Sequence, residues 1–193
     1  MYKIMTPGPT QVAENVRLAR SRECTNPDLD ENFVEFYKET CKKISHLLHT
    51  DNETLILDGE GILGLEAACA SMTEPGDLVL DNGIYGKGFA DFVSMYGGCP
   101  ELYSRDYRET LDVQELENFL KEHHNYKYAT VVHGDTPSGM LNDVSAICPL
   151  LKKYDIMTVV DSVSASFGEP MRISDWQIDI MCGGSQKVVS APP

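Results

Sequence analysis

Two residues near the ends of apolar stretches could act together in chemistry: Asp161 after 156–160, and Lys187 after 178–182. A lysine amine can form a Schiff base with an aldehyde, although a lone lysine is more often a surface residue. A carboxylate at the end of a buried strand is costly to desolvate without a cationic or hydrogen-bonding partner, although Asp161 could instead cap a following helix. The pair predicts either amine chemistry or two unrelated structural roles.

Two further segments could hold a ligand. Residues 59–62 (Gly-Glu-Gly-Ile) would lead into a helix, where free backbone N–H groups can bind a phosphate, but a tight turn without a ligand fits equally and Glu60 adds a negative charge. Thr136 and Ser138 could donate hydrogen bonds, but they are also ordinary loop formers. A phosphate turn, an amine and a carboxylate are together the groups that pyridoxal phosphate requires.

The elements that must position these residues alternate between helices and strands. Helical periodicity predicts helices at 30–49, 62–72, 85–96, 113–122 and 144–154. Short apolar runs predict strands at 54–57, 78–80 (after a turn at Pro75-Gly76-Asp77), 128–133, 156–160 and 178–182. This alternation predicts a three-layer α/β/α fold with a mainly parallel sheet, whose ligands gather at the carboxyl ends of the strands. We expect an N-terminal segment at 1–20 and one large domain at 21–193.

Composition narrows the function classes. The 193 residues carry a net charge of −14, which argues against nucleic-acid binding because phosphate backbones need clustered cations. The sequence lacks an apolar run long enough for a membrane span, and its N-terminus lacks a signal peptide, so we expect a cytoplasmic protein without membrane partners. The six cysteines are scattered and are expected to be reduced and mostly buried. We expect no metal site, since His46 and His49 lack further ligands at metal spacing.

The order of the motifs resembles the class V aminotransferase family of fold type I pyridoxal-phosphate enzymes. It is similar to the branch of alanine–glyoxylate and serine–pyruvate aminotransferases, with 2-aminoethylphosphonate–pyruvate transaminase as a relative. The motifs that carry the resemblance are Thr6-Pro-Gly-Pro-Thr10, Gly59-Glu-Gly61, Leu65-Glu-Ala-Ala68, Glu74-Pro-Gly-Asp77, Asn82-Gly-Ile-Tyr-Gly86, His133-Gly-Asp-Thr136, Asp161-Ser-Val163, Ser185-Gln-Lys187 and Ala191-Pro-Pro193.

The resemblance implies two catalytic residues. Lys187 would form the internal aldimine with pyridoxal phosphate and later move the substrate Cα proton, and Asp161 would pair with the pyridinium nitrogen. Val163 and Tyr85 would contact the two ring faces, Tyr85 standing where the family often has Trp. The full set implied to contact the cofactor is Gly59, Glu60, Gly61, Ile62, Tyr85, Thr136, Asp161, Val163, Gln186 and Lys187. Glu60 replaces the small hydroxyl residue usual in the family, so the backbone of the turn is expected to bind the phosphate.

The resemblance further implies transfer of an amino group from a small amino acid, alanine or serine, to a 2-oxo acid, glyoxylate or pyruvate, in a homodimer. Lyase or desulfurase chemistry of the same fold, a 2-aminoethylphosphonate–pyruvate transaminase and an inactive truncated chain are the alternatives. Family members are longer, so we expect this chain to be an N-terminal half that lacks the small domain, the arginine for the substrate carboxylate and an internal antiparallel strand. A dinucleotide site is disfavoured because the turn at 59–61 lacks the third glycine.

Overall fold

The computed structural model describes residues 2–73, 76–123 and 125–192, so Pro75 of the predicted turn, His124 and Pro193 lie outside the described residues. A parallel sheet forms the centre of the chain, with the strand order β2-β1-β3-β6-β7. These strands are β1 (Asp77–Asp81), β2 (Glu101–Ser104), β3 (Tyr128–Val132), β6 (Met157–Asp161) and β7 (Ile180–Cys182). A short antiparallel hairpin, β4 (Gly134–Asp135) and β5 (Met140–Leu141), follows β3.

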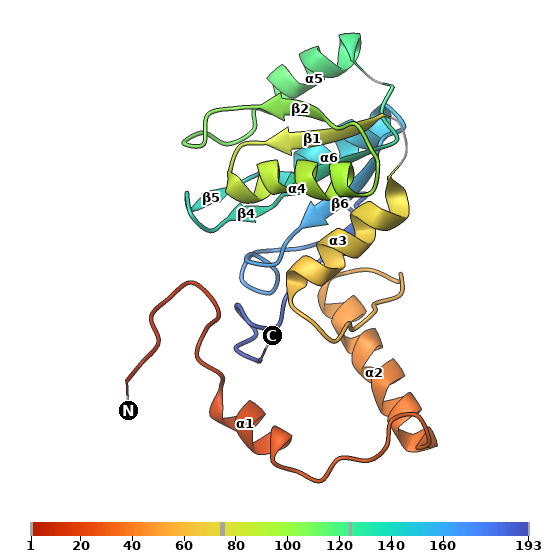
Figure 1. The fold of residues 1–193 in the computed structure, drawn as a ribbon, viewed down its shortest axis with the longest axis vertical. Coiled ribbons are helices and arrows are strands. Elements are labelled where there is room, and N and C mark those ends of the chain that lie inside the picture. The colour runs from red at the N-terminus through yellow and green to blue at the C-terminus, as the bar shows by residue number, and fades with distance from the viewer. Residues whose placement is uncertain (1, 74–75, 124, 193) are drawn as a thin grey trace.

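Helices cover both faces of the sheet (Figure 1). They are α3 (Gly61–Met72) and α4 (Ile84–Met95) on one face and α5 (Val113–Glu122) and α6 (Val144–Lys153) on the other. Side chains alternate along each strand, so Val79 of β1 packs with α3 and α4, whereas Leu78 and Leu80 pack with α5 and α6. The predicted three-layer α/β/α fold with a parallel sheet is confirmed.

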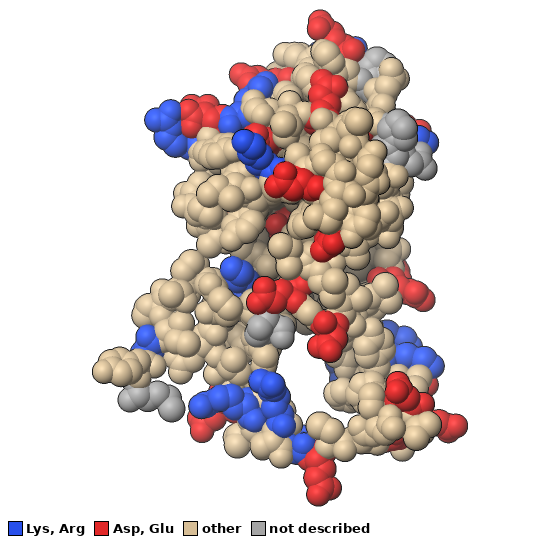
Figure 2. Space-filling view, in the orientation of Figure 1, with Lys and Arg blue, Asp and Glu red and all other residues tan. Residues whose placement is uncertain are grey.

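Two more helices precede the sheet and extend away from it (Figure 1). They are α1 (Glu14–Arg20), in which no described residue is buried, and α2 (Glu31–Leu47). Helix α2 begins where the Asp30 side chain accepts a hydrogen bond from the Asn32 N–H at 2.9 Å, a typical N-cap. Figure 2 shows acidic and basic side chains scattered over one face of the molecule.

The predicted strand at Thr54–Leu57 is wrong. Its apolar residues are exposed, with Leu55 at 73%, and the described residues place no strand beside the segment. The Tyr37 hydroxyl instead satisfies the backbone of Ile56, accepting from its N–H at 2.9 Å and donating to its carbonyl at 3.2 Å. A run of apolar residues predicts burial but cannot supply the neighbouring strand that pairing requires.

The sequence also missed α1, β2 and the β4–β5 hairpin, whose segments are too short for a periodic pattern to show. The expectation of mostly buried, reduced cysteines is confirmed, since Cys41, Cys69, Cys148 and Cys182 are buried and all six are free. Within the described residues, no helix combines the length and apolarity needed to cross a membrane.

Candidate functional site

The carboxyl ends of parallel strands share one edge of the sheet, and Asp161 is the last residue of β6 at that edge. Its side chain is 7% exposed, and its Oδ1 accepts a hydrogen bond from the Val163 N–H at 2.9 Å. Burial raises the pKa of Asp161 to about 6, and the nearby Asp135 adds to this, whereas the Val163 N–H and the charge of Lys187 oppose it. Asp161 is therefore a buried carboxylate within electrostatic reach of Lys187.

Lys187 lies in the loop that follows β7 and is partly buried. Its side chain lies against Gly8: a Cβ built on Gly8 would be 2.4 Å from the lysine Nζ and Cδ. The structure thus brings the amine and the Asp161 carboxylate into one region. In the sequence, 25 residues lie between them, and Asp161 ends β6 whereas Lys187 follows β7.

Val163 joins three segments of the predicted site. A Cβ on Gly61 would lie 2.4 Å from Val163 Cγ2, and one on Gly184 would lie 2.9 Å from Val163 Cγ1 and 2.5 Å from Gln186 Oε1. Gln186 is 6% exposed, and its Oε1 is buried without a hydrogen-bond partner among the described residues. A buried amide oxygen without such a partner is a group that a polar ligand would satisfy.

The turn at Gly59–Ile62 presents the start of α3. Glu60 is the N-cap residue, its exposed side chain makes no capping hydrogen bond, and the first turn of the helix holds no acidic residue. The first N–H groups of a helix lack intrahelical partners. Gly61, which is buried, and Ile62, which is 57% exposed, are the first two residues of α3 and thus offer its first backbone donors.

Tyr85 and Thr136 lie at the same edge of the sheet but are not shown in contact with Lys187. Tyr85 is the second residue of α4 and is 49% exposed, and Thr136 follows β4 and is partly buried. Their loops touch, because a Cβ on Gly83 would lie 2.7 Å from Asp135 Oδ1. The structure therefore joins Gly61, Val163 and Asp161 by direct contacts, with Gln186 beside Gly184 and Lys187 within electrostatic reach of Asp161. Tyr85 and Thr136 are linked only through neighbouring residues.

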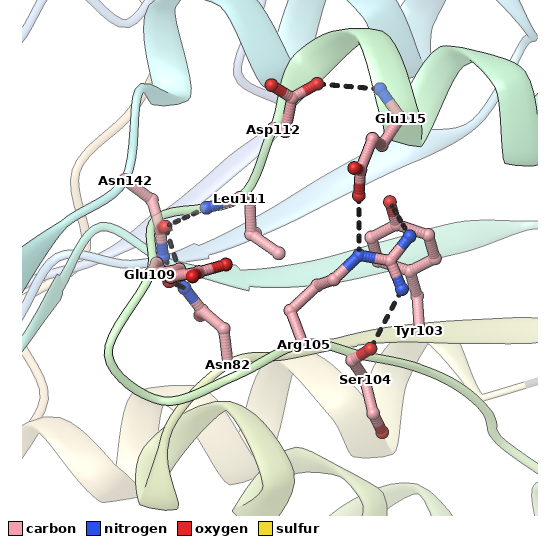
Figure 3. Close-up of polar contacts among 9 residues, drawn as sticks. All are labelled: Asn82, Tyr103, Ser104, Arg105, Glu109, Leu111, Asp112, Glu115 and Asn142. Atoms are coloured by element: carbon pink, nitrogen blue, oxygen red, sulfur yellow. Dashed lines mark hydrogen bonds and ion pairs between the residues drawn. The ribbon is translucent and has the colours of Figure 1, made fainter.

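A pair of buried asparagines, which the sequence did not single out as site residues, fixes these loops (Figure 3). Asn82 follows β1 and Asn142 follows β5, and their side-chain amides exchange hydrogen bonds at 2.9 and 3.1 Å. The Asn142 amide also donates to the Val132 carbonyl at 2.8 Å and accepts from the Leu111 N–H at 3.0 Å. Asn82 belongs to a motif of the resemblance, whereas nothing in the sequence around Asn142 distinguishes it from a loop residue.

In the same view, Arg105 donates to the Tyr103 hydroxyl at 2.5 Å and to Glu115 at 3.2 Å, which ties the loop after β2 to α5 (Figure 3). In the close-up, this ion pair lies to one side of the Asn82–Asn142 pair. It supports the fold of the sheet edge and brings no predicted site residue with it.

His133, which begins one of the motifs of the resemblance, is only 4% exposed. Its Nδ1 lies 3.1 Å from the Ser162 hydroxyl, and its ring contacts Trp176 edge-on. Burial lowers the pKa of His133, against the opposing charges of Glu169 and Asp143. His133 thus forms part of the packed support behind Asp161.

A hollow of about 590 Å³ lies elsewhere, between α2 and residues 50–55. It includes His46 but none of the predicted site residues. Among the described residues, no three His, Cys, Asp or Glu side chains gather closely enough to hold a metal ion. The predicted site with Asp161 and Lys187 therefore lies away from this hollow, at the edge of the sheet.

Several known proteins are similar to this chain in sequence. The Aminotransferase class-V family matches residues 89–193, which include Asp161 and Lys187. Pyridoxamine–pyruvate transaminase of Mesorhizobium japonicum is 35% identical over 98% of this chain and 48% of its own length, and alanine–glyoxylate aminotransferase of Felis catus is 31% identical over 98% and 46%. The chain thus spans about half the length of these relatives.

A solved structure gives the same result for the fold. The crystal structure of pyridoxamine–pyruvate aminotransferase from Mesorhizobium loti superimposes with a TM-score of 0.94 at 32% identity, covering 100% of this chain and 49% of that one. The chain belongs to the class V aminotransferase family, whose members depend on pyridoxal phosphate.

Proposed function

We propose that this chain forms the cofactor-binding half of a transaminase that moves an amino group from a small amino acid, alanine or serine, to glyoxylate or pyruvate. One observation supports the proposal: the buried Asp161 carboxylate lies within electrostatic reach of the Lys187 amine at one sheet edge of a class V chain. The relatives named above use pyruvate or glyoxylate, by their names, which supports a small 2-oxo acid as acceptor.

The described residues fit pyridoxal phosphate in three respects. Asp161 keeps one oxygen on the Val163 N–H, which leaves the other for the protonated ring nitrogen. Gly61 and Ile62 present helix-start N–H groups to a phosphate. Val163, which contacts Gly61, shares Gly184 as a neighbour with the buried amide of Gln186, whose oxygen has no hydrogen-bond partner among the described residues. Lys187 supplies the amine within reach of Asp161.

When bound, pyridoxal phosphate supplies an electron sink for negative charge at the substrate Cα. Lys187 would hold its aldehyde and, once displaced by the amino donor, accept the Cα proton at Nζ and return it to the cofactor. Asp161, ionised at neutral pH because its pKa is about 6, would hold the proton on the ring nitrogen. Val163 and Tyr85 would contact the two ring faces, and Thr136 the ring hydroxyl.

We also propose a homodimer, in which the second copy covers this edge of the sheet. Several large apolar side chains around the predicted site are exposed, as unpaired interface residues would be: Ile62 at 57%, Ile84 at 63%, Tyr85 at 49% and Val188 at 44%. A neighbouring subunit would also supply charge to balance Glu60 near the phosphate.

The test is the absorption spectrum of the chain with pyridoxal phosphate, followed by borohydride reduction and peptide mapping. We expect a visible band and a reduced adduct at Lys187 that is lost in Lys187→Ala and kept in Lys87→Ala, which changes an exposed lysine on α4. Adding alanine or serine should discharge the band, and pyruvate or glyoxylate should restore it. An adduct on other lysines with none at Lys187 would contradict the proposal.

A further inference from the structure

The N-terminal segment, residues 6–10 (Thr-Pro-Gly-Pro-Thr), lies against the lysine of the predicted site. A Cβ on Gly8 would be 2.4 Å from Cδ, 2.7 Å from Cε and 2.4 Å from Nζ of Lys187. Real Cβ atoms do not approach other atoms so closely, so the whole outer half of the lysine side chain occupies the space that any other residue at position 8 would fill. The end of the Lys187 side chain therefore packs directly against Gly8.

Thr10 binds two consecutive backbone carbonyls, those of Gln186 and of Lys187 itself. Its N–H donates to the Gln186 carbonyl at 2.8 Å, and its hydroxyl donates to the Lys187 carbonyl at 2.6 Å and lies 3.2 Å from that of Gln186. The Ala13 N–H donates to the Ser190 carbonyl at 2.9 Å, which adds a second attachment to the same loop. One threonine thus fixes two consecutive carbonyls of the loop that carries Lys187.

The N-terminal segment is mostly exposed in the residues that the structure describes. Helix α1, which follows it, has no buried residue, and Figure 2 shows an open gap between this part of the chain and α2. In Figure 1 the red segment runs beside the blue end of the chain, where the hydrogen bonds of Thr10 and Ala13 join the two. In the part of the chain that the structure describes, the hydrogen bonds that residues 6–13 make beyond residue 20 all go to the loop around Lys187.

We propose that Gly8 and Thr10 are positioning residues for Lys187, which makes the N-terminal segment part of the active site. Lysine has a long side chain with many accessible rotamers, and an amine that must meet a bound aldehyde needs a fixed location. Gly8 limits the lysine on one side, and Thr10 fixes the backbone from which it projects. The role of the amine rests on the proposed function, but its placement does not.

The test measures the amine itself, without cofactor. The 193-residue chain is labelled with acetic anhydride, and the rate at Lys187 is compared with that of exposed Lys87 by mass spectrometry. We expect Gly8→Ala to push the side chain outward and raise the Lys187 rate several-fold. Gly88→Ala is the matched control, because a Cβ on Gly88 meets nothing within 4 Å. Thr10→Val should raise the rate as well, and Thr10→Ser, which keeps the hydroxyl, should restore it.

A second readout separates positioning from general destabilisation. Lys187 lowers the pKa of Asp161, so displacement of the amine should raise that pKa in Gly8→Ala, as measured by carboxyl NMR, while the urea midpoint stays near that of the wild type. Unchanged labelling of Lys187 in folded Gly8→Ala and Thr10→Val would overturn the inference. If Gly8→Ala does not fold, the Thr10→Val and Thr10→Ser pair decides it. Failure of the proposed function would appear separately, as a wild-type chain that binds no pyridoxal phosphate but still shows these labelling differences.

Discussion

Gly61 and Val163 lie in direct contact, so that a Cβ on Gly61 would come within 2.4 Å of Val163 Cγ2 and 3.0 Å of its Cγ1. The same valine side chain faces Gly184. The predicted phosphate turn, the segment that follows Asp161 and the loop before Lys187 therefore meet at this one side chain, Val163. Val163 is branched at Cβ and has few rotamers, so it cannot turn away easily from an added methyl group.

Gly61→Ala is expected to destabilise the chain by about 1–3 kcal/mol through overpacking against Val163. Gly64→Ala, in the same helix, is the control: its Cβ would meet Cys182 Sγ at an ordinary 3.5 Å, so it should stabilise by about 0.5–1 kcal/mol through helix propensity. Urea denaturation measures both. The double variant Gly61→Ala, Val163→Ala should recover part of the loss, and equal stability of the two alanine variants would contradict the contact.

The buried carboxyl of Asp161 should make stability depend on pH. Its pKa is about 6 in the folded chain against the ordinary 3.8, mainly because burial disfavours the charged form. Between about pH 4 and 6 the folded state holds a proton that the unfolded state has released, so this group's stabilisation is present below about pH 4 and is lost as the pH rises through about 6. The loss amounts to about 3 kcal/mol from the size of the shift.

Asp161→Asn keeps an oxygen for the Val163 N–H and removes the charge, so without cofactor it should be more stable than the wild type at pH 7 by about 2–3 kcal/mol and nearly equal at pH 4. Urea midpoints at several pH values measure this difference. Asp58→Asn, at an exposed aspartate, should show no such trend. A difference between Asp161→Asn and wild type that stays constant with pH would contradict the raised pKa.

Much of the fold follows from local patterns in the sequence. Helices such as α2 and α5 have apolar residues at helical spacing, and strands such as β3 and β6 are short apolar runs bounded by polar ones. The rule that parallel strands present their carboxyl ends at one edge then places Asp161 near the loop of Lys187. These inferences depend only on neighbours in the sequence and on one property of parallel sheets.

Other features depend on partners far away in the sequence, which no local pattern encodes. The residues around Leu55 have the apolar pattern of a strand. Leu55 is nevertheless exposed, because no strand among the described residues lies beside this segment. Asn142 looks like a loop residue until Asn82 is placed opposite it. The contact of Gly8 with Lys187 joins the two ends of the chain. In each case tertiary packing decides the role of the residue.

The amide pair of Asn82 and Asn142 is expected to be important for stability. Asn142→Ala would remove the side-chain partner of the Leu111 N–H, of the Val132 carbonyl and of Asn82 Oδ1 in a buried environment, while the Asn82 NH2 group keeps the Glu109 carbonyl. The expected loss is about 2–4 kcal/mol, measured by urea denaturation. Asn118→Ala, at an exposed position on α5, should change stability by less than about 0.5 kcal/mol. A similar small change in Asn142→Ala would show that water replaces these bonds.

Glu60 offers a test of whether the start of α3 binds the phosphate group. Its exposed side chain makes no capping hydrogen bond, but its charge lies at the N-cap, where a bound anion would meet it. Glu60→Gln removes only the charge and should tighten the binding of pyridoxal phosphate by about two- to fivefold at low salt. Glu60→Ser should tighten it at least as much, since it also restores a capping hydroxyl.

Fluorescence titration with pyridoxal phosphate measures these affinities, and Asp91→Asn, at an exposed aspartate on α4, controls for the change in net charge. The effect of Glu60→Gln should shrink as salt screens the charge, because the side chain is exposed. If Glu60→Gln and Asp91→Asn change the affinity equally, only the net charge matters and the phosphate binds away from this turn. If Glu60→Gln weakens binding, the carboxylate itself contributes to the site, through a cation or a donor that it would then have to hold near the phosphate.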